Sequence, residues 1–121
     1  MWVWHQKVGK MYDKNGSCVG CGYSGLDAGK NNPAMQADHG TGPIPQGTYK
    51  MTGLEQNGPT GPNTVILVPD KDTNTFGRSE FRIHGDSVSH PGQASHGCII
   101  LPLLVRLRIW GSHDHDLQVV A

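Results

Sequence analysis

The sequence predicts a mainly β fold: a small, β-rich α+β domain with one short helix. The 17 glycines and eight prolines in 121 residues imply many tight turns. Short runs of β-branched and aromatic residues lie between these turns, and only residues 102–110 carry apolar side chains at helical spacing. The length suits one modest core, so we expect a single domain over residues 1–121, built as a curved sheet or sandwich.

The N-terminal half is expected to contain two strands and a long loop. Residues 2–12 alternate loosely between apolar and polar side chains, which favours a strand. The Asn-Gly pair at 15–16 predicts a hairpin turn that leads into a second strand over 18–23. Residues 24–47 are rich in Gly, Asn, Asp and Pro, and a loop of this length in a small domain usually surrounds a functional site.

The C-terminal half is expected to consist of short strands and one helix. The segments with strand composition are residues 48–54, 64–68, 79–84, 98–101 and 117–120. Pro102 fits the first turn of a helix over 102–110, and Gly111 ends it. The side chains expected to share the apolar face of this helix are Leu103, Leu104, Leu107 and Trp110.

Charge and hydropathy exclude several classes of partner. Ten basic and ten acidic residues give a formal net charge of zero, so we expect neither nucleic acid nor an anionic membrane as a ligand. No apolar run approaches the roughly 20 residues that cross a bilayer, so we expect no membrane insertion. Residues 1–7 lack the features of a signal peptide. We therefore expect synthesis in the cytoplasm and, if the protein is exported, a route that needs no such signal.

The three cysteines leave at least one thiol free, because an odd number cannot form a complete set of disulfides. Cys18 and Cys21 form a CxxC pair, which is half of a zinc site. The histidines available to complete it are His39, His113 and His115, but their spacing to the pair is not that of a known zinc motif. We expect two strand or hairpin cysteines here and assign no metal site. A small zinc-binding interaction domain remains an alternative.

Cys98 is the candidate nucleophile. It follows the small turn Ser95-His96-Gly97, which leaves room for a substrate carbonyl to approach the sulfur. The backbone N–H groups of Gly97 and Cys98 are candidates for stabilising an oxyanion. A cysteine attacks as the thiolate, so it needs a neighbouring base. The alternative is that Cys98 is a small buried residue at the start of an apolar strand.

Two histidines compete for the role of base. His84 ends the strand expected over 79–84, and His90 lies in the loop that follows. We favour His84, because a strand end holds a catalytic group more rigidly than a loop does. His96 is expected to act through its backbone beside the nucleophile, and Asp86 to form a turn.

The order strand-His-Gly, loop, Ser-His-Gly-Cys-Ile resembles the active-site signature of the L,D-transpeptidase (YkuD-type) catalytic domain. The resemblance implies an L,D-transpeptidase-like fold, with Cys98 as nucleophile, His84 as base, and Ser95, His96 and Gly97 shaping the oxyanion site. Two features depart from the pattern. The loop over 85–94 is shorter than is usual in the secreted cell-wall enzymes, and Ile100 stands where many members carry Arg or Asn.

Most of the chain is similar to a compact branch of that superfamily found among antibacterial effectors of type VI secretion. The matching segments are residues 22–25, 29–33, 42–49, 95–102, 105–106 and 109–110. The residues expected along the substrate groove are Tyr23, Tyr49, Arg82 and His90.

The resemblance implies an enzyme that trims peptidoglycan stem tetrapeptides (L,D-carboxypeptidase), or exchanges their terminal D-amino acid (L,D-transpeptidase), without a cofactor. It also implies a monomeric toxin that acts in the periplasm of a target cell and is neutralised in the producer by a cognate immunity protein. A catalytically silent module that only binds stem peptides is the second alternative.

Overall fold

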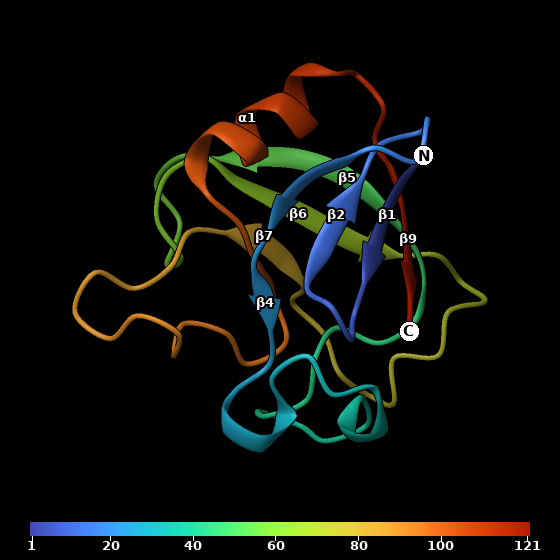
Figure 1. The fold of residues 1–121 in the computed structure, drawn as a ribbon, viewed down its shortest axis with the longest axis vertical. Coiled ribbons are helices and arrows are strands. Elements are labelled where there is room, and N and C mark those ends of the chain that lie inside the picture. The colour runs from blue at the N-terminus through green and yellow to red at the C-terminus, as the bar shows by residue number, and fades with distance from the viewer.

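The computed structural model describes residues 1–121 as one curled, nine-stranded sheet with a single α-helix (Figure 1). The strands are β1 (Trp2–His5), β2 (Lys10–Tyr12), β3 (Cys18–Cys21), β4 (Tyr23–Ser24), β5 (Gly47–Glu55), β6 (Thr64–Pro69), β7 (Arg82–His84), β8 (Ile99–Ile100) and β9 (Asp116–Val120). The helices are α1 (Leu103–Gly111) and two 3-10 turns, Asp27–Gly29 and Pro33–Met35. The mainly β, curved-sheet prediction is confirmed.

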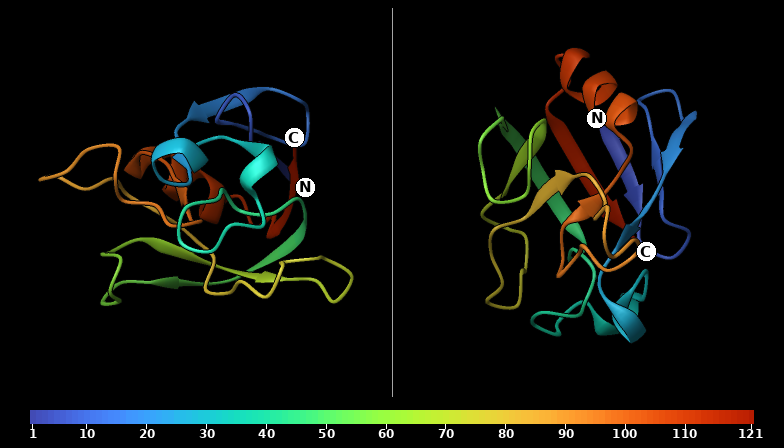
Figure 2. Two further views of the ribbon diagram at one scale, coloured as in Figure 1. Left: turned by 90° about the horizontal axis from the view of Figure 1, so that it is seen from below. Right: turned by 90° about the vertical axis from the view of Figure 1, so that its left-hand side faces the viewer.

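The sheet curls until its two edges almost meet. Its strand order is β3-β2-β1-β9-β5-β6-β7-β8-β4, so the edge strands β3 and β4 are consecutive in the chain and are joined only by Gly22. Figure 2 shows β5 and β6 on one side of the molecule and β2 and β3 on the other. A Cβ on Gly22 would overlap the carbonyl oxygen of Ile100, so only glycine fits where the chain crosses between the edges.

The core lies inside this curl. Its buried aromatic and aliphatic side chains come from every strand except the two edge strands β3 and β4, from α1 and from the segments between them. The buried core residues are Trp2, Trp4, Met11, Ile44, Tyr49, Met51, Val65, Leu67, Phe81, Ile83, Ile99, Leu101, Ile109, Leu117 and Val119. Because Ile83 and Ile99 face the core, the alternation of strand side chains turns their neighbours on β7 and β8 to the opposite face.

The strand predicted over residues 2–12 is wrong as one element. The chain turns at residues 6–9 and forms the antiparallel hairpin β1–β2 instead. Gln6 is fully buried in this turn and donates to the carbonyl of Ile44, while Gly9 has a φ of +64°. The hairpin turn predicted at Asn15-Gly16 is confirmed between β2 and β3, and the strand predicted over 18–23 is interrupted at Gly22.

The strand predicted over residues 79–84 is shorter in the structure, where β7 begins only at Arg82. Glu80 has a φ of +63°, a left-handed conformation that a strand cannot contain. The chain therefore bends away from the sheet just before β7, and this bend forms one wall of the site described below. The strand predicted over 98–101 is reduced to β8, which leaves Cys98 in the bend that precedes it.

The helix is where predicted, but its predicted apolar face is wrong. Leu103, Leu104 and Leu107 are exposed, at 45, 79 and 41 %. The buried side chains are Arg106 and Ile109. Leucines flank both sides of α1, so spacing alone does not identify its packed face. None of the helices has the length and apolar character needed to cross a membrane.

Candidate active site around Cys98

Cys98 opens into a hollow of about 320 Å³ between the bend before β7 and the bend before β8. The residues that line it are His39, Gly40, Gly77, Arg78, Ser79, Glu80, Phe81, His96, Gly97 and Cys98. The thiol is partly exposed, and its Sγ lies 3.6 Å from the carbonyl oxygen of Glu80. A peptide carbonyl entering the hollow would therefore meet the sulfur.

Arg78 holds the walls of this hollow together. Its guanidinium donates to four backbone carbonyls that belong to three separate segments of the chain. The acceptors are the carbonyls of Gln36 at 2.6 Å, Pro43 at 2.7 Å, Gly42 at 2.8 Å and His96 at 3.0 Å. Because Arg78 is 8 % exposed, these carbonyls replace water as its hydrogen-bond partners. The long loop over 24–47 is thus fixed to the turn that carries Cys98.

Ser95 organises the backbone of the cysteine turn from inside. Its fully buried hydroxyl donates to the carbonyl of Cys98 at 2.5 Å and accepts from the N–H groups of Gly25 and Gly97, at 2.9 and 3.2 Å. The Gly97 N–H, expected to help bind an oxyanion, is therefore occupied. The Cys98 N–H donates to no protein atom, and it is the donor of this turn that is left for an incoming oxygen.

Burial raises the pKa of the Cys98 thiol above its ordinary value. The backbone N–H of Arg82 and the charges of Arg82 and Arg78 act in the opposite direction but do not compensate for the lost hydration. Cys98 is therefore a neutral thiol near pH 7 in the free protein. A base must remove its proton during attack.

His84 lies on the strand beside Cys98 and on the same face. Strands β7 and β8 pair in parallel with Ile83 opposite Ile99 and His84 opposite Ile100, so extending the register puts Arg82 opposite Cys98. Neighbouring strands lie about 4.8 Å apart and two residues advance about 6.6 Å, so roughly 8 Å separates the Cα atoms of His84 and Cys98. No hydrogen bond joins the two side chains in this conformation.

The imidazole of His84 has the protonation state that a base requires. Its Nδ1 lies 2.8 Å from the carbonyl of Gly85, which can only accept, so Nδ1 carries the hydrogen and Nε2 the lone pair. Burial lowers the pKa of His84 first, and the positive charges of Arg106 and Arg82 lower it further. His84 is therefore a neutral imidazole at pH 7.

A comparison with family models decides what kind of domain surrounds this site. The model of the Tlde1 domain matches residues 19–120, which is most of the chain. The chain belongs to the Tlde1 domain family. This is a family of type VI secretion effectors with peptidoglycan-related activity, so the expected link to antibacterial effectors is confirmed. A search of the curated proteins and a search of the solved structures each found no match.

Two other predicted residues of this Tlde1 domain lie beside the cysteine. His96 is exposed on the rim of the hollow, where its Nδ1 lies 2.9 Å from the carbonyl of Gly40. Arg82 is half-buried, and its Nε lies 3.6 Å from a carboxylate oxygen of Glu55. His96 therefore lines the hollow, whereas Arg82 lies on the neighbouring strand and does not line it.

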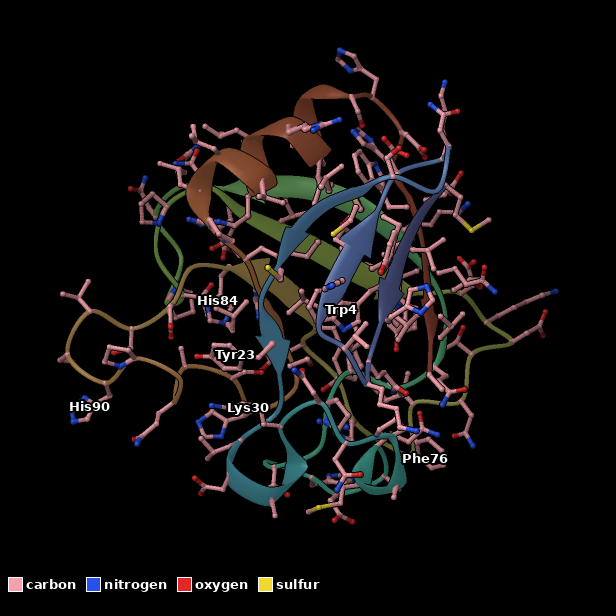
Figure 3. The ribbon with its side chains drawn as sticks, viewed as in Figure 1. Trp4, Tyr23, Lys30, Phe76, His84 and His90 are labelled. Atoms are coloured by element: carbon pink, nitrogen blue, oxygen red, sulfur yellow. The ribbon has the colours of Figure 1, made fainter.

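His90 does not reach the cysteine hollow. Figure 3 shows it at the tip of the loop after β7, away from His84. It is exposed, and its Nδ1 lies 3.0 Å from the hydroxyl of Ser89. Neither His90 nor His84 lines the hollow around Cys98, but His84 lies on the strand next to the bend that carries Cys98. Unless this loop moves, His84 is the better placed of the two candidate bases.

The two tyrosines assigned to the substrate groove have different environments. Tyr49 is 1 % exposed, donates to the carbonyl of Pro45 at 2.8 Å and packs edge-on against Phe81. Its assignment to the groove is wrong, because the side chain belongs to the core. Tyr23 is half-buried, and its hydroxyl donates to Asp86 at 2.5 Å and accepts from the N–H of Ala94 at 3.0 Å. It thereby fastens both ends of the loop over 85–94.

The zinc-binding alternative gains no support. Cys18 and Cys21 are exposed free thiols on the edge strand β3, and the structure gathers no set of three side chains able to hold a metal ion. The imidazole of His115 instead stacks on Trp110, with ring centroids 4.2 Å apart.

Sequence reasoning missed the residues that shape the hollow. Arg78 comes just before the strand predicted over 79–84, Glu80 lies within it, and neither matches a motif. His39 lies in the middle of the long loop. The glycine at position 97 carried one signal. Its φ is +141°, and a Cβ there would collide with Nη2 of Arg78, so a glycine next to a candidate nucleophile pointed to a close neighbour.

Proposed function

We propose that this Tlde1 domain is a cysteine-dependent L,D-carboxypeptidase and L,D-transpeptidase that acts on peptidoglycan stem tetrapeptides. The observation that carries the proposal is the environment of Cys98. Its thiol opens into a hollow beside its own unpaired backbone N–H, and a neutral His84 lies on the same face of the adjacent strand. A candidate nucleophile and oxyanion donor thus come from the bend that leads into β8, and a candidate base from the neighbouring strand β7.

The first half of the reaction forms a thioester. The Cys98 proton passes to Nε2 of His84 as the sulfur bonds to the carbonyl carbon of the L,D peptide bond, and the carbonyl oxygen becomes an oxyanion that accepts from the Cys98 N–H. The oxyanion then collapses and the carbon–nitrogen bond breaks. His84 returns its proton to the departing amine, which leaves as the terminal D-amino acid.

The second half decides between hydrolysis and exchange. Water or the amine of another D-amino acid attacks the thioester, and His84 takes the proton of the attacking group and returns it to the sulfur. With water the product is a tripeptide, and with an amine it is a tetrapeptide with a new terminus. Cys98 must rotate from the Glu80 carbonyl toward His84 for the first proton transfer, because the two side chains are not hydrogen-bonded at rest.

The biological setting follows from the family. Type VI secretion effectors enter target cells and are typically paired with immunity proteins. We infer that the substrate is the peptidoglycan of a target cell, reached in its periplasm. We also infer that a cognate immunity protein acts by covering the hollow around Cys98.

Mass spectrometry of purified muropeptides tests the activity. Wild-type protein should remove the terminal D-alanine from tetrapeptides, and a labelled D-amino acid in the buffer should appear in the product if exchange occurs. Cys98→Ala and His84→Gln should each abolish both changes. Cys18→Ala and His90→Gln are matched controls, because each removes an exposed side chain of the same type, and both should stay active.

One observation favours the second candidate, a silent module that binds stem peptides without turnover. Cys98 has a raised pKa and no hydrogen bond to a histidine. If wild-type protein binds tetrapeptides in a titration but leaves their mass unchanged, the enzyme proposal fails and the binding module replaces it.

A further inference from the structure

Arg106 is a buried cation without a partner. Its side chain is 7 % exposed, and none of its guanidinium nitrogens makes a hydrogen bond or ion pair, with Nε and Nη1 fully enclosed. Its backbone N–H continues the helix by donating to Pro102. A buried guanidinium costs free energy unless an anion or several acceptors compensate it. Arg78, the other arginine buried to this degree, has four acceptors.

No acidic residue of the protein supplies the missing charge. Desolvation lowers the pKa of Arg106, and no carboxylate opposes that effect. The nearby acids are engaged elsewhere. Glu55 pairs with Arg82, and Asp86 accepts from the hydroxyl of Tyr23 and from the N–H groups of Ser87 and Gly92. The charges that do act on neighbouring His84 include the cations of both Arg106 and Arg82.

The guanidinium lies behind the wall of a second hollow. A Cβ on Gly85 would stand 3.0 Å from Nη2 of Arg106 and 3.3 Å from Nη1, so the guanidinium lies directly against this glycine, with Nη2 as its one nitrogen that is not fully enclosed. Gly85 lines a hollow of about 210 Å³. The other residues that line this hollow are Cys21, Gly22, Tyr23, Asp86, Ile100, Leu101 and Pro102.

The same hollow receives the N-terminus of α1. Pro102 lines it and is the N-cap residue of this nine-residue helix, and no side chain caps the first turn. The free N–H groups of a first turn favour an anion. Ile100 forms part of the floor between His84 on one side and Tyr23 on the other. The hollow therefore lies beside the strand that carries the candidate base, and its floor residue Ile100 is two residues beyond Cys98.

We propose that Arg106, together with the first turn of α1, binds a carboxylate of the substrate, and specifically the terminal α-carboxylate of the D-amino acid that leaves. This rests on the proposed function, which makes that D-amino acid the leaving group. Nη2 is free to donate to one carboxylate oxygen, and the uncapped N–H groups of the first turn favour the same negative charge. Ile100 occupies the position where the resemblance expects a polar substrate contact, and Arg106 lies behind the same stretch of strand and supplies one from the helix.

The test is a binding titration with inactive protein, so that it does not depend on turnover. Cys98→Ala protein is titrated with a synthetic stem tetrapeptide ending in D-alanine and with its C-terminal carboxamide. We expect the acid to bind about tenfold tighter or more, since a hydrogen bond to a charged group has this value. Adding Arg106→Met should reduce the affinity for the acid to that for the amide. Adding Arg108→Met, an exposed arginine of the same helix, should leave the preference unchanged.

A purely structural role for Arg106 predicts a different pattern. If the guanidinium only packs the helix, Arg106→Met lowers the melting temperature and weakens both ligands equally. If it serves a ligand, the variant melts at the same or a higher temperature, because an uncompensated buried charge is gone. Arg106→Lys keeps the positive charge but removes the guanidinium group, and it should retain part of the preference for the acid.

The remaining outcomes overturn the inference. If Cys98→Ala binds the acid and the amide with equal affinity, the protein does not recognise the terminal carboxylate. If the preference for the acid survives Arg106→Met, residues other than Arg106 bind the carboxylate. If the affinity falls only when the internal carboxylates of the peptide are amidated, Arg106 contacts one of those carboxylates and not the terminal one. Wild-type protein that binds the acid through Arg106 and yet cleaves nothing would refute the enzyme proposal alone.

Discussion

The guanidinium of Arg78 lies against the Cα of Gly97, in space that the side chain of any other residue would occupy. A Cβ at position 97 would come closer to Nη2 than van der Waals contact allows. Arg78 cannot yield, because its guanidinium donates to carbonyls of three different chain segments around the hollow, including that of His96. Residue 97 is also left-handed, with a φ of +141°. The turn that carries Cys98 and the Arg78 guanidinium, called the clamp below, therefore each restrict the space available to the other.

Gly97→Ala is expected to lower the free energy of unfolding by about 2–4 kcal/mol, from backbone strain and displaced hydrogen bonds together. Loss of muropeptide cleavage should accompany it, since the turn carries Cys98. Urea unfolding measures the first effect and mass spectrometry the second. Gly111→Ala is the control, because a Cβ there meets no atom within 4 Å and it should be neutral or stabilising by up to about 1 kcal/mol. A Gly97→Ala protein of wild-type stability would contradict the clamp.

Arg78→Met tests the same contact by changing the arginine instead of the glycine. It leaves the carbonyls that Arg78 binds without donors, two of them in the buried segment over 42–45. We expect the free energy of unfolding to fall by about 3–5 kcal/mol, as when one partner of a buried polar network is deleted. Arg108→Met, at an exposed position, should change it by less than about 0.5 kcal/mol. Similar losses for both variants in urea unfolding would show that the carbonyls are compensated by water.

Tyr23→Phe tests whether the loop over 85–94 is fastened by one hydroxyl. Burial and the bond to Asp86 raise the pKa of Tyr23 to about 12, so the hydroxyl stays protonated and donates throughout the accessible pH range. Its removal should cost about 1–2 kcal/mol and speed hydrogen exchange at the Ala94 amide. Tyr12→Phe is the control, because that hydroxyl makes no hydrogen bond in the structure. Unchanged exchange at Ala94 would show that the loop is held by its own backbone contacts.

The fold was largely accessible from the sequence because turn signals and β-branched runs act locally. The hairpin at Asn15-Gly16 and the strands β5, β6 and β9 depend on such local signals, and they are confirmed. The bend at Glu80 was not accessible. The left-handed Glu80 lies between Arg78 and Phe81, both of which bond to distant segments, and no local sequence pattern encodes its conformation.

The site divides in the same way. Local patterns, namely strand ends and a turn of small residues, point to Cys98, His84 and Ser95 as candidate site residues. Tyr49 was misassigned because an aromatic after a Gly-Pro loop is compatible with a groove or a core, and only the packed structure distinguishes them. Arg106 was hidden in a helix whose leucines suggested another buried face. That its guanidinium is buried without a hydrogen-bond partner can be recognised only from the structure, where its neighbours are known.

The pH dependence of the reaction and of thiol alkylation should differ, because Cys98 and His84 are both neutral at rest. Since burial and two arginines lower the pKa of His84, cleavage should hold constant from about pH 8 to pH 6.5 and fall only in more acidic buffer, where the imidazole gains a proton. The free energy of unfolding should depend on pH in the same direction. The unfolded chain binds that proton more readily, so stability is lost as the pH falls below about 6.5, and His84→Gln should remove part of this loss.

Alkylation isolates the thiol. In a Cys18→Ala/Cys21→Ala protein, Cys98 is the sole target of iodoacetamide, and burial raises its pKa. Its rate of modification at pH 7 should therefore lie below that of a small free thiol and should rise about tenfold per pH unit until it passes the ordinary thiol pKa of about 8.5. Fast, pH-independent alkylation at pH 6–8 would instead demonstrate a preformed thiolate–imidazolium pair. The general-base step drawn for His84 would then be replaced by attack from an ion pair.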